Sequence, residues 1–159
     1  MTRVLGVDPG SRFTGWGVVE ANRNRMSSVG AGVIKLNPKA PLADRLEVIY
    51  DSLEALIVEH RPDAVAVEEV FYAKFPNAAI KLGHVRGVVL LLVAKRGLPL
   101  GEYAPALVKR TVAGRGAADK EQLGRLVGAM LGLETKTLGV DATDALAIAI
   151  THLSAIGRR

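Results

Sequence analysis

The order of strand-like and helix-like segments limits the possible folds of this chain more than any other feature. Three strand-like segments come first, at residues 3–8, 15–20 and 28–36, and turn-forming residues separate them. Residues 41–60 follow, opened by a proline and carrying apolar side chains at three- and four-residue spacing. The first 60 residues therefore predict an antiparallel meander followed by an amphipathic helix.

The rest of the chain alternates between the two kinds of segment. A strand is expected at 63–68, a helix at 77–96, a strand at 98–103, and helices at 105–114, 118–131 and from 141 onward. This order predicts an α/β fold of the ribonuclease H type: a mixed five-stranded sheet, three antiparallel strands followed by parallel ones, flanked by helices. With no internal repeat or linker, residues 1–159 are expected to form a single domain.

Composition narrows the possible functions. The chain has no cysteine, which excludes disulfides, thiolate zinc sites and a cysteine nucleophile. No signal-peptide pattern opens it, and Lys81, His84 and Arg86 interrupt its longest apolar stretch. A soluble cytoplasmic protein with no membrane partner is expected. The net charge of +5 suggests a nucleic-acid partner, although ordinary solubility charge would explain it equally well.

Acidic residues stand at the ends of two predicted strands. Asp8 is followed by Pro9-Gly10, which holds it extended before a sharp turn, although an Asp that merely starts a turn would look the same. Glu68 and Glu69 follow an apolar strand. Because side chains alternate along a strand, only one of these two can point to the same face as a given inward residue. A solvated strand end is the competing interpretation.

Two further aspartates open the last predicted helix. Asp141 and Asp144 are three residues apart and so share one helix face, but acidic residues in a first turn also stabilise any helix. Together with Asp8 and one of the two glutamates they would form an all-oxygen set of ligands, which favours a hard cation, Mg²⁺ or alternatively Mn²⁺. Two such ions can activate water for attack on a phosphodiester.

At these residues the chain closely resembles the RuvC family of Holliday junction resolvases. The resemblance runs in order through Gly6–Gly10, Thr14–Gly17, Ala66–Phe71, Lys81–Gly83, Arg86-Gly87, Val108-Lys109, Gly114–Lys120 and Asp141–His152. It implies a homodimeric, Mg²⁺-dependent endonuclease, with two ions per site, that nicks four-way junction DNA symmetrically in recombination and repair. It also implies the RuvA–RuvB branch-migration complex as a partner.

The resemblance assigns roles to particular residues. It places Asp8, Glu68, Asp141 and Asp144 in the metal site and leaves Glu69 outside, where the family more often has Gln. Lys109 and Lys120 correspond to family lysines near the scissile phosphate, where a fixed ammonium can neutralise developing charge. The expected DNA contacts comprise these two lysines with Phe71, Tyr72, Lys81, Arg86 and Arg115. Phe71 and Tyr72 could also act as a stacking wedge at the junction centre.

Two alternatives to the nuclease make different predictions for this sequence. A catalytically silent nucleic-acid-binding domain on the same fold predicts that one of the four carboxylates is missing, and none is. An actin-like phosphotransferase would need a second phosphate loop and a much longer chain. His152 is interpreted as a structural residue, and the helix at 77–96, which is apolar all round in its later half, is expected to be deeply buried or to contact a partner subunit.

Overall fold

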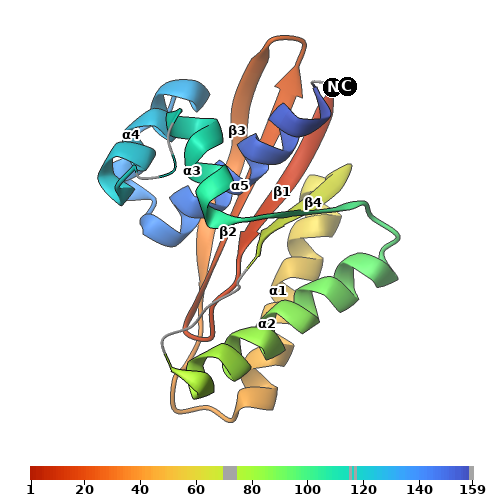
Figure 1. Cartoon of the computed structure of the whole chain (residues 1–159). Helices are drawn as coiled ribbons and strands as arrows, with labels where there is room; N and C mark the ends of the chain where they lie inside the picture. Colours follow the sequence, from red (N-terminus) through yellow and green to blue (C-terminus); the bar gives the residue numbers. More distant parts are fainter. Residues whose placement is uncertain (70–74, 115, 117, 158–159) are drawn as a thin grey trace.

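The computed structural model describes residues 1–69, 75–114, 116 and 118–157 (Figure 1). Its sheet is formed by β1 (Thr2–Asp8), β2 (Phe13–Asn22), β3 (Arg25–Lys35), β4 (Ala64–Glu68) and β5 (Leu100–Tyr103), in the order β3-β2-β1-β4-β5. The pairs β1/β2 and β2/β3 are antiparallel, whereas β1/β4 and β4/β5 are parallel. The predicted mixed five-stranded sheet is confirmed.

Helices cover both faces of this sheet. One face carries α1 (Leu42–His60) and α2 (Pro76–Lys95), and the other carries α3 (Pro105–Ala113), α4 (Lys120–Leu131) and α5 (Val140–Ile156) (Figure 1). Side chains alternate along the strands, so odd-numbered residues of β1 and β4 pack towards α1 and α2, and even-numbered ones pack towards α5. This alternation decides the direction of any side chain at the end of either strand.

Several boundaries differ from those expected. β2 begins two residues earlier, and a short 3-10 helix, η1 (Thr135–Thr137), was not predicted. The helix α4 begins at Lys120, because Asp119 caps it by accepting a hydrogen bond from the Gln122 amide at 2.7 Å. The N-cap of α5 is Gly139, which provides no side-chain cap. Asp141 lies in the first turn of α5, and its carboxylate does not cap the helix.

The helix α2 is more apolar than its charged interruptions suggested. By length and composition alone α2 could cross a membrane, and 22% of its apolar stretch is buried inside this chain. Val85, Val89, Leu92 and Val93 are buried in the core between α1 and the sheet. One such helix is weak evidence for a membrane span, and the opposite face, with Leu91 56% exposed, is available to a partner.

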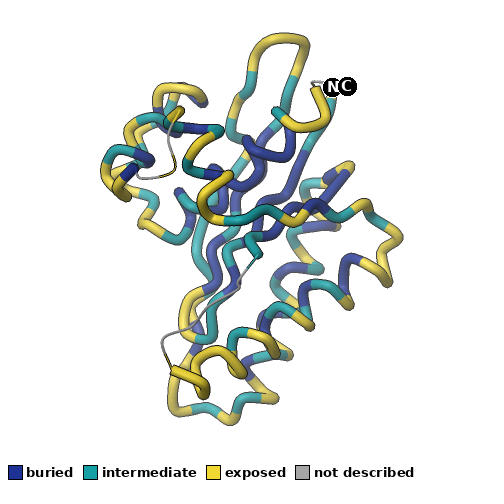
Figure 2. Tube along the Cα trace, in the orientation of Figure 1, coloured by how far each residue is buried: buried dark blue, intermediate teal, exposed yellow. Residues whose placement is uncertain are grey.

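Glycines bring α5 unusually close to the sheet. A Cβ at Gly6 would lie 2.0 Å from the Ala145 carbonyl oxygen, and one at Gly15 would lie 2.0 Å from the Asp141 carbonyl oxygen. Backbone thus contacts backbone along this helix, which is buried over most of its length (Figure 2). The closeness fixes the position of the first turn of α5 relative to the end of β1.

We expect Gly6→Ala to destabilise the protein by about 3 kcal/mol or more, because the new methyl group must displace the backbone of α5 rather than a flexible side chain. The matched control is Gly83→Ala in α2, where a Cβ would have no neighbour within 4 Å. That change should stabilise the protein by about 0.5–1 kcal/mol, through helix propensity alone. Urea unfolding measures both, and equal stability of the two variants would contradict the close packing of α5.

Candidate active site

Asp8 is the last residue of β1, and the turn after it is firmly held. The Thr14 hydroxyl donates to the Gly10 carbonyl oxygen at 2.8 Å, and the buried Arg45 guanidinium of α1 donates to the Ser11 carbonyl oxygen at 3.0 Å. Asp8 shares the parity of Val4 and Gly6, the residues of β1 that face α5. Its carboxylate is therefore fixed under the first turn of that helix.

Glu68 ends β4, which lies beside β1 in parallel register. It shares the parity of Ala64 and Ala66, which pack towards α5, and so points to the same face as Asp8. The amide of Glu69 donates to the Tyr103 carbonyl oxygen at 2.8 Å, and Glu69 does not line the cavity described below. The alternation of strand side chains thus distinguishes two glutamates that the sequence alone left equivalent.

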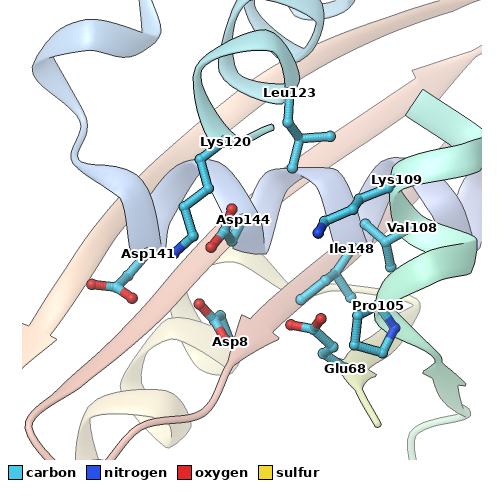
Figure 3. Close-up of a pocket in the computed structure, with 10 residues that line it drawn as sticks. All are labelled: Asp8, Glu68, Pro105, Val108, Lys109, Lys120, Leu123, Asp141, Asp144 and Ile148. Carbon is cyan, nitrogen blue, oxygen red and sulfur yellow. The ribbon is translucent and has the colours of Figure 1, made fainter. Parts of the chain in front are cut away.

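All four predicted carboxylates line one cavity of about 280 Å³ (Figure 3). Its lining residues come from β1, β4, α3, α4 and α5: Asp8, Glu68, Pro105, Val108, Lys109, Lys120, Leu123, Asp141, Asp144 and Ile148. Asp8, Glu68 and Asp144 face a common space in the close-up, and Asp141 lies further out, at the start of α5 (Figure 3). Segments far apart in the chain therefore supply one acidic site.

The acidic groups disfavour one another's ionisation. Burial, followed by the charges of Asp144, Glu68 and Asp141, raises the pKa of Asp8 from 3.8 to about 8. Burial also raises the pKa of Glu68, and Asp144 adds to that effect. The pKa of Asp144 is raised, again chiefly by burial. The buried position of these carboxylates and the negative charges beside them therefore favour a cation in the cavity.

Two lysines supply part of that charge. Lys109 extends from α3, which the buried Val108 and Val112 hold against the core, and Lys120 is the first residue of α4. Both ammonium groups lower the pKa values of Glu68 and Asp144, and Lys120 also lowers that of Asp8. Neither forms a direct ion pair with a carboxylate of the described residues. Both remain available to a phosphate.

The donor set fits a hard divalent cation. Four carboxylates face two ammonium groups, and carboxylate oxygens are the ligands that Mg²⁺ and Mn²⁺ prefer. Within the described part of the chain, no three acidic or histidine side chains are gathered closely enough, as they stand, to enclose one ion. Carboxylates repel one another when no cation lies between them, and a bound cation would let them come closer together.

Sequence reasoning missed the apolar wall of the cavity. Val108, Leu123 and Ile148 line it beside the carboxylates, and burial is the largest cause of the raised pKa values. These residues read as ordinary core positions of three helices. No sequence signal marks them as neighbours, because only the packing of α3, α4 and α5 brings them together.

Other predicted site residues lie elsewhere. Lys81 and Arg86 are on α2, outside the cavity, and Arg86 forms an ion pair with Glu102 at 3.0 Å. Phe71, Tyr72 and Arg115 fall outside the described residues. The structural interpretation of His152 agrees with its position: its Nδ1 lies 2.8 Å from the Tyr103 hydroxyl, in the buried layer between α5 and β5.

Comparison with known proteins gives a consistent result. The family profile described as "Crossover junction endodeoxyribonuclease RuvC" matches residues 4–152. A protein of that description from Sorangium cellulosum is 52% identical over 98% of this chain and 86% of its own length. One from Myxococcus xanthus is also 52% identical, over 96% of this chain and 80% of its own length.

Solved structures agree with the sequence relatives. Thermus thermophilus RuvC in complex with a Holliday junction substrate superposes with a TM-score of 0.91 at 34% identity, covering 99% of this chain and 97% of that one. The yeast mitochondrial Holliday junction resolvase Ydc2 has a TM-score of 0.67 at 17% identity, covering 94% of this chain and 77% of that one. At that identity the second match shows a shared fold.

Proposed function

The chain belongs to the RuvC family of crossover junction endodeoxyribonucleases, and on that premise we propose that the carboxylate cavity is where it hydrolyses a phosphodiester of four-way junction DNA. One observation carries the proposal: Asp8, Glu68, Asp141 and Asp144, from two strands and a helix, line a single cavity together with two lysines. A silent DNA-binding domain would have no need for a cavity in which burial and neighbouring charges raise the pKa values of Asp8, Glu68 and Asp144.

Family members are divalent-metal-dependent nucleases, and we infer that Mg²⁺, as two ions per site, is the cofactor here. Asp8, Glu68 and Asp144 would hold the cation, with Asp141 at the outer edge. Divalent ions in such sites make water a stronger nucleophile and offset charge on the phosphate. Mn²⁺ satisfies the same ligands and is expected to substitute.

The protein's own groups position the DNA strand. Lys109 and Lys120 extend over the cavity from α3 and α4 and can donate to the non-bridging oxygens of a phosphate placed there (Figure 3). Val108, Leu123 and Ile148 keep one wall apolar, which strengthens these electrostatic contacts by excluding water. The carboxylates are acceptors that can orient an attacking water and receive its proton.

The test is a comparison of substrates. The protein is incubated with a synthetic four-way junction and with a linear duplex of the same sequence, with and without Mg²⁺, and the nicks are mapped at nucleotide resolution. Symmetric nicks in the junction alone, dependent on the metal, are the expected result. Equal cutting of the duplex, or cutting after chelation, would contradict the proposal.

The protein is also proposed to act as a homodimer through α2, which would match two sites to a junction with twofold symmetry. Ile80 and Leu91 on this helix are 60% and 56% exposed, a large apolar exposure for a helix whose other side is in the core. Two further parts of the proposal follow from family membership alone. The RuvA–RuvB complex is the partner that delivers the junction, and the protein is located in the cytoplasm.

We expect Leu91→Lys to weaken the dimer by at least about 30-fold in dissociation constant, since a charge in an apolar interface costs about 2 kcal/mol or more. Sedimentation velocity measures the effect. The matched control is Val29→Lys on β3, the edge strand furthest from β5, where the side chain is 40% exposed. A variant at Leu91 that sediments like the Val29 variant would show that α2 is not the interface.

A further inference from the structure

A groove leaves the carboxylate cavity along α4. Its first part, about 330 Å³, shares Lys120 and Asp144 with the carboxylate cavity and is also lined by Arg125, Lys136 and Thr143. A further hollow of about 550 Å³ shares Arg125, Thr135 and Lys136 with that first part. The shared residues make the three spaces consecutive, so a single path runs from the carboxylates along α4 to η1.

The electrostatic character changes along this path. At its inner end four carboxylates face two lysines, whereas further out Lys120, Arg125 and Lys136 face Glu121 and Glu134. A side-chain oxygen of Glu134 accepts from the Lys136 amide at 3.4 Å, so this carboxylate is turned towards the backbone of η1. Arg125 and Lys136 are both exposed and form no ion pair with any described carboxylate. Both cations are therefore free to bind an anion.

The floor of the groove is built from small residues, and its shape is fixed. A Cβ at Gly124 would meet only the side chains of Thr135 and Thr143, at 3.6 and 3.8 Å, so no bulky group fills the space above the first turns of α4. The Thr135 hydroxyl donates to the Gly124 carbonyl oxygen at 2.9 Å and ties η1 to α4. This hydrogen bond sets the position of Lys136 relative to Arg125 before any ligand binds.

We propose that this groove, with Arg125 and Lys136 as its contacts, binds backbone phosphates of the DNA strand on one side of the bond that is cut. The inference rests on the proposed function, since it assumes that a strand enters at the carboxylates. Successive phosphates then need positive charge beyond the metal site, which Lys120, Arg125 and Lys136 supply in sequence. Because these are phosphate contacts, the groove holds the strand in place without reading its bases.

The experiment measures junction affinity as a function of salt. Arg125→Gln, Lys136→Gln and the double variant are each titrated against a fluorescently labelled four-way junction without divalent metal, over a range of NaCl concentrations. Each single change should reduce the slope of log affinity against log salt by about 1, and the double change by about 2, equally for junctions of different sequence. The matched control is Arg25→Gln, an exposed arginine at the β2–β3 hairpin that lines none of these spaces.

The control Arg25→Gln should keep the wild-type slope of log affinity against log salt. If the groove variants keep that slope as well, the proposal that Arg125 and Lys136 bind phosphates is wrong. Wild-type cleavage of the same junction with Mg²⁺ is scored separately and reports on the proposed function. If the wild type cuts the junction but the groove variants bind it with the wild-type slope, phosphate binding in the groove is contradicted and the proposed nuclease function is not. If the groove variants lose slope as expected but the wild type never cuts the junction, phosphate binding in the groove is supported and the proposed nuclease function is contradicted.

Discussion

Glu68→Gln should reduce the single-turnover rate of junction cleavage by at least about 10³-fold, whereas Glu69→Gln should leave it within about twofold. The two residues are adjacent in sequence and chemically identical, but only Glu68 lines the carboxylate cavity. The amide in place of Glu68 keeps its shape and removes the negative charge that a divalent cation needs. Asp8→Asn and Asp144→Asn should have effects of the same size, because they remove charge from the same cavity.

Junction affinity separates this effect from misfolding. Without divalent metal, the Glu68, Asp8 and Asp144 variants should bind the junction at least as tightly as the wild type, because an amide cannot carry the negative charge that repels phosphate. Fluorescence anisotropy gives the affinity, and gel analysis of a labelled junction gives the rate. Cleavage retained by any of the three variants, or lost equally by the Glu69 variant, would remove the metal-site assignment.

The second large effect concerns the metal-free protein, whose stability should fall as pH rises from about 4 to about 8. In the unfolded chain Asp8 loses its proton near pH 3.8, whereas in the folded protein its pKa is raised to about 8, mainly by burial. Between these values the unfolded state binds fewer protons, so the free energy of unfolding decreases by up to about 1.4 kcal/mol per pH unit. The raised pKa values of Glu68 and Asp144 act in the same direction.

Three thermal measurements test this. Asp8→Asn should raise the Tm of the metal-free protein at pH 8 by about 5 °C or more and flatten its pH dependence, and millimolar Mg²⁺ should raise the wild-type Tm at that pH. Asp51→Asn, which changes an exposed carboxylate of α1, is the control and should do neither. A wild-type Tm that is constant from pH 5 to 8 without metal would mean that neither burial nor the neighbouring carboxylates raise the pKa of Asp8 in the folded protein.

Much of this arrangement could be predicted because local signals agree with the fold. Turn residues and apolar spacing located the five strands and five α-helices of the described residues, and the meander followed by alternating elements predicted a mixed sheet. The choice between Glu68 and Glu69 required knowing which face of β4 meets α5, and that depends on tertiary packing. The family resemblance predicts Glu68, and strand alternation in the structure gives a physical reason for that prediction.

What could not be predicted depends on contacts between distant segments. Arg125 and Lys136 read as ordinary solvated residues of a helix and a turn, and only the Thr135–Gly124 hydrogen bond places them on one groove. The short helix η1 has no apolar periodicity to reveal it. Lys81 and Arg86 differ from these residues, because they belong to motifs that the sequence does reveal. Both lie on α2 and outside the carboxylate cavity.

The dependence of the site on α5 has a consequence for synthesis of the protein. Asp8 and Glu68 leave the ribosome well before Asp144, and the contacts of Gly6 and Gly15 with α5 can form only once this helix has been made. A nascent or truncated chain without α5 would therefore lack Asp141 and Asp144, two of the four proposed metal ligands, and we expect it not to cut DNA. The proposed metal site can be completed only after α5 has been made and packed against the sheet.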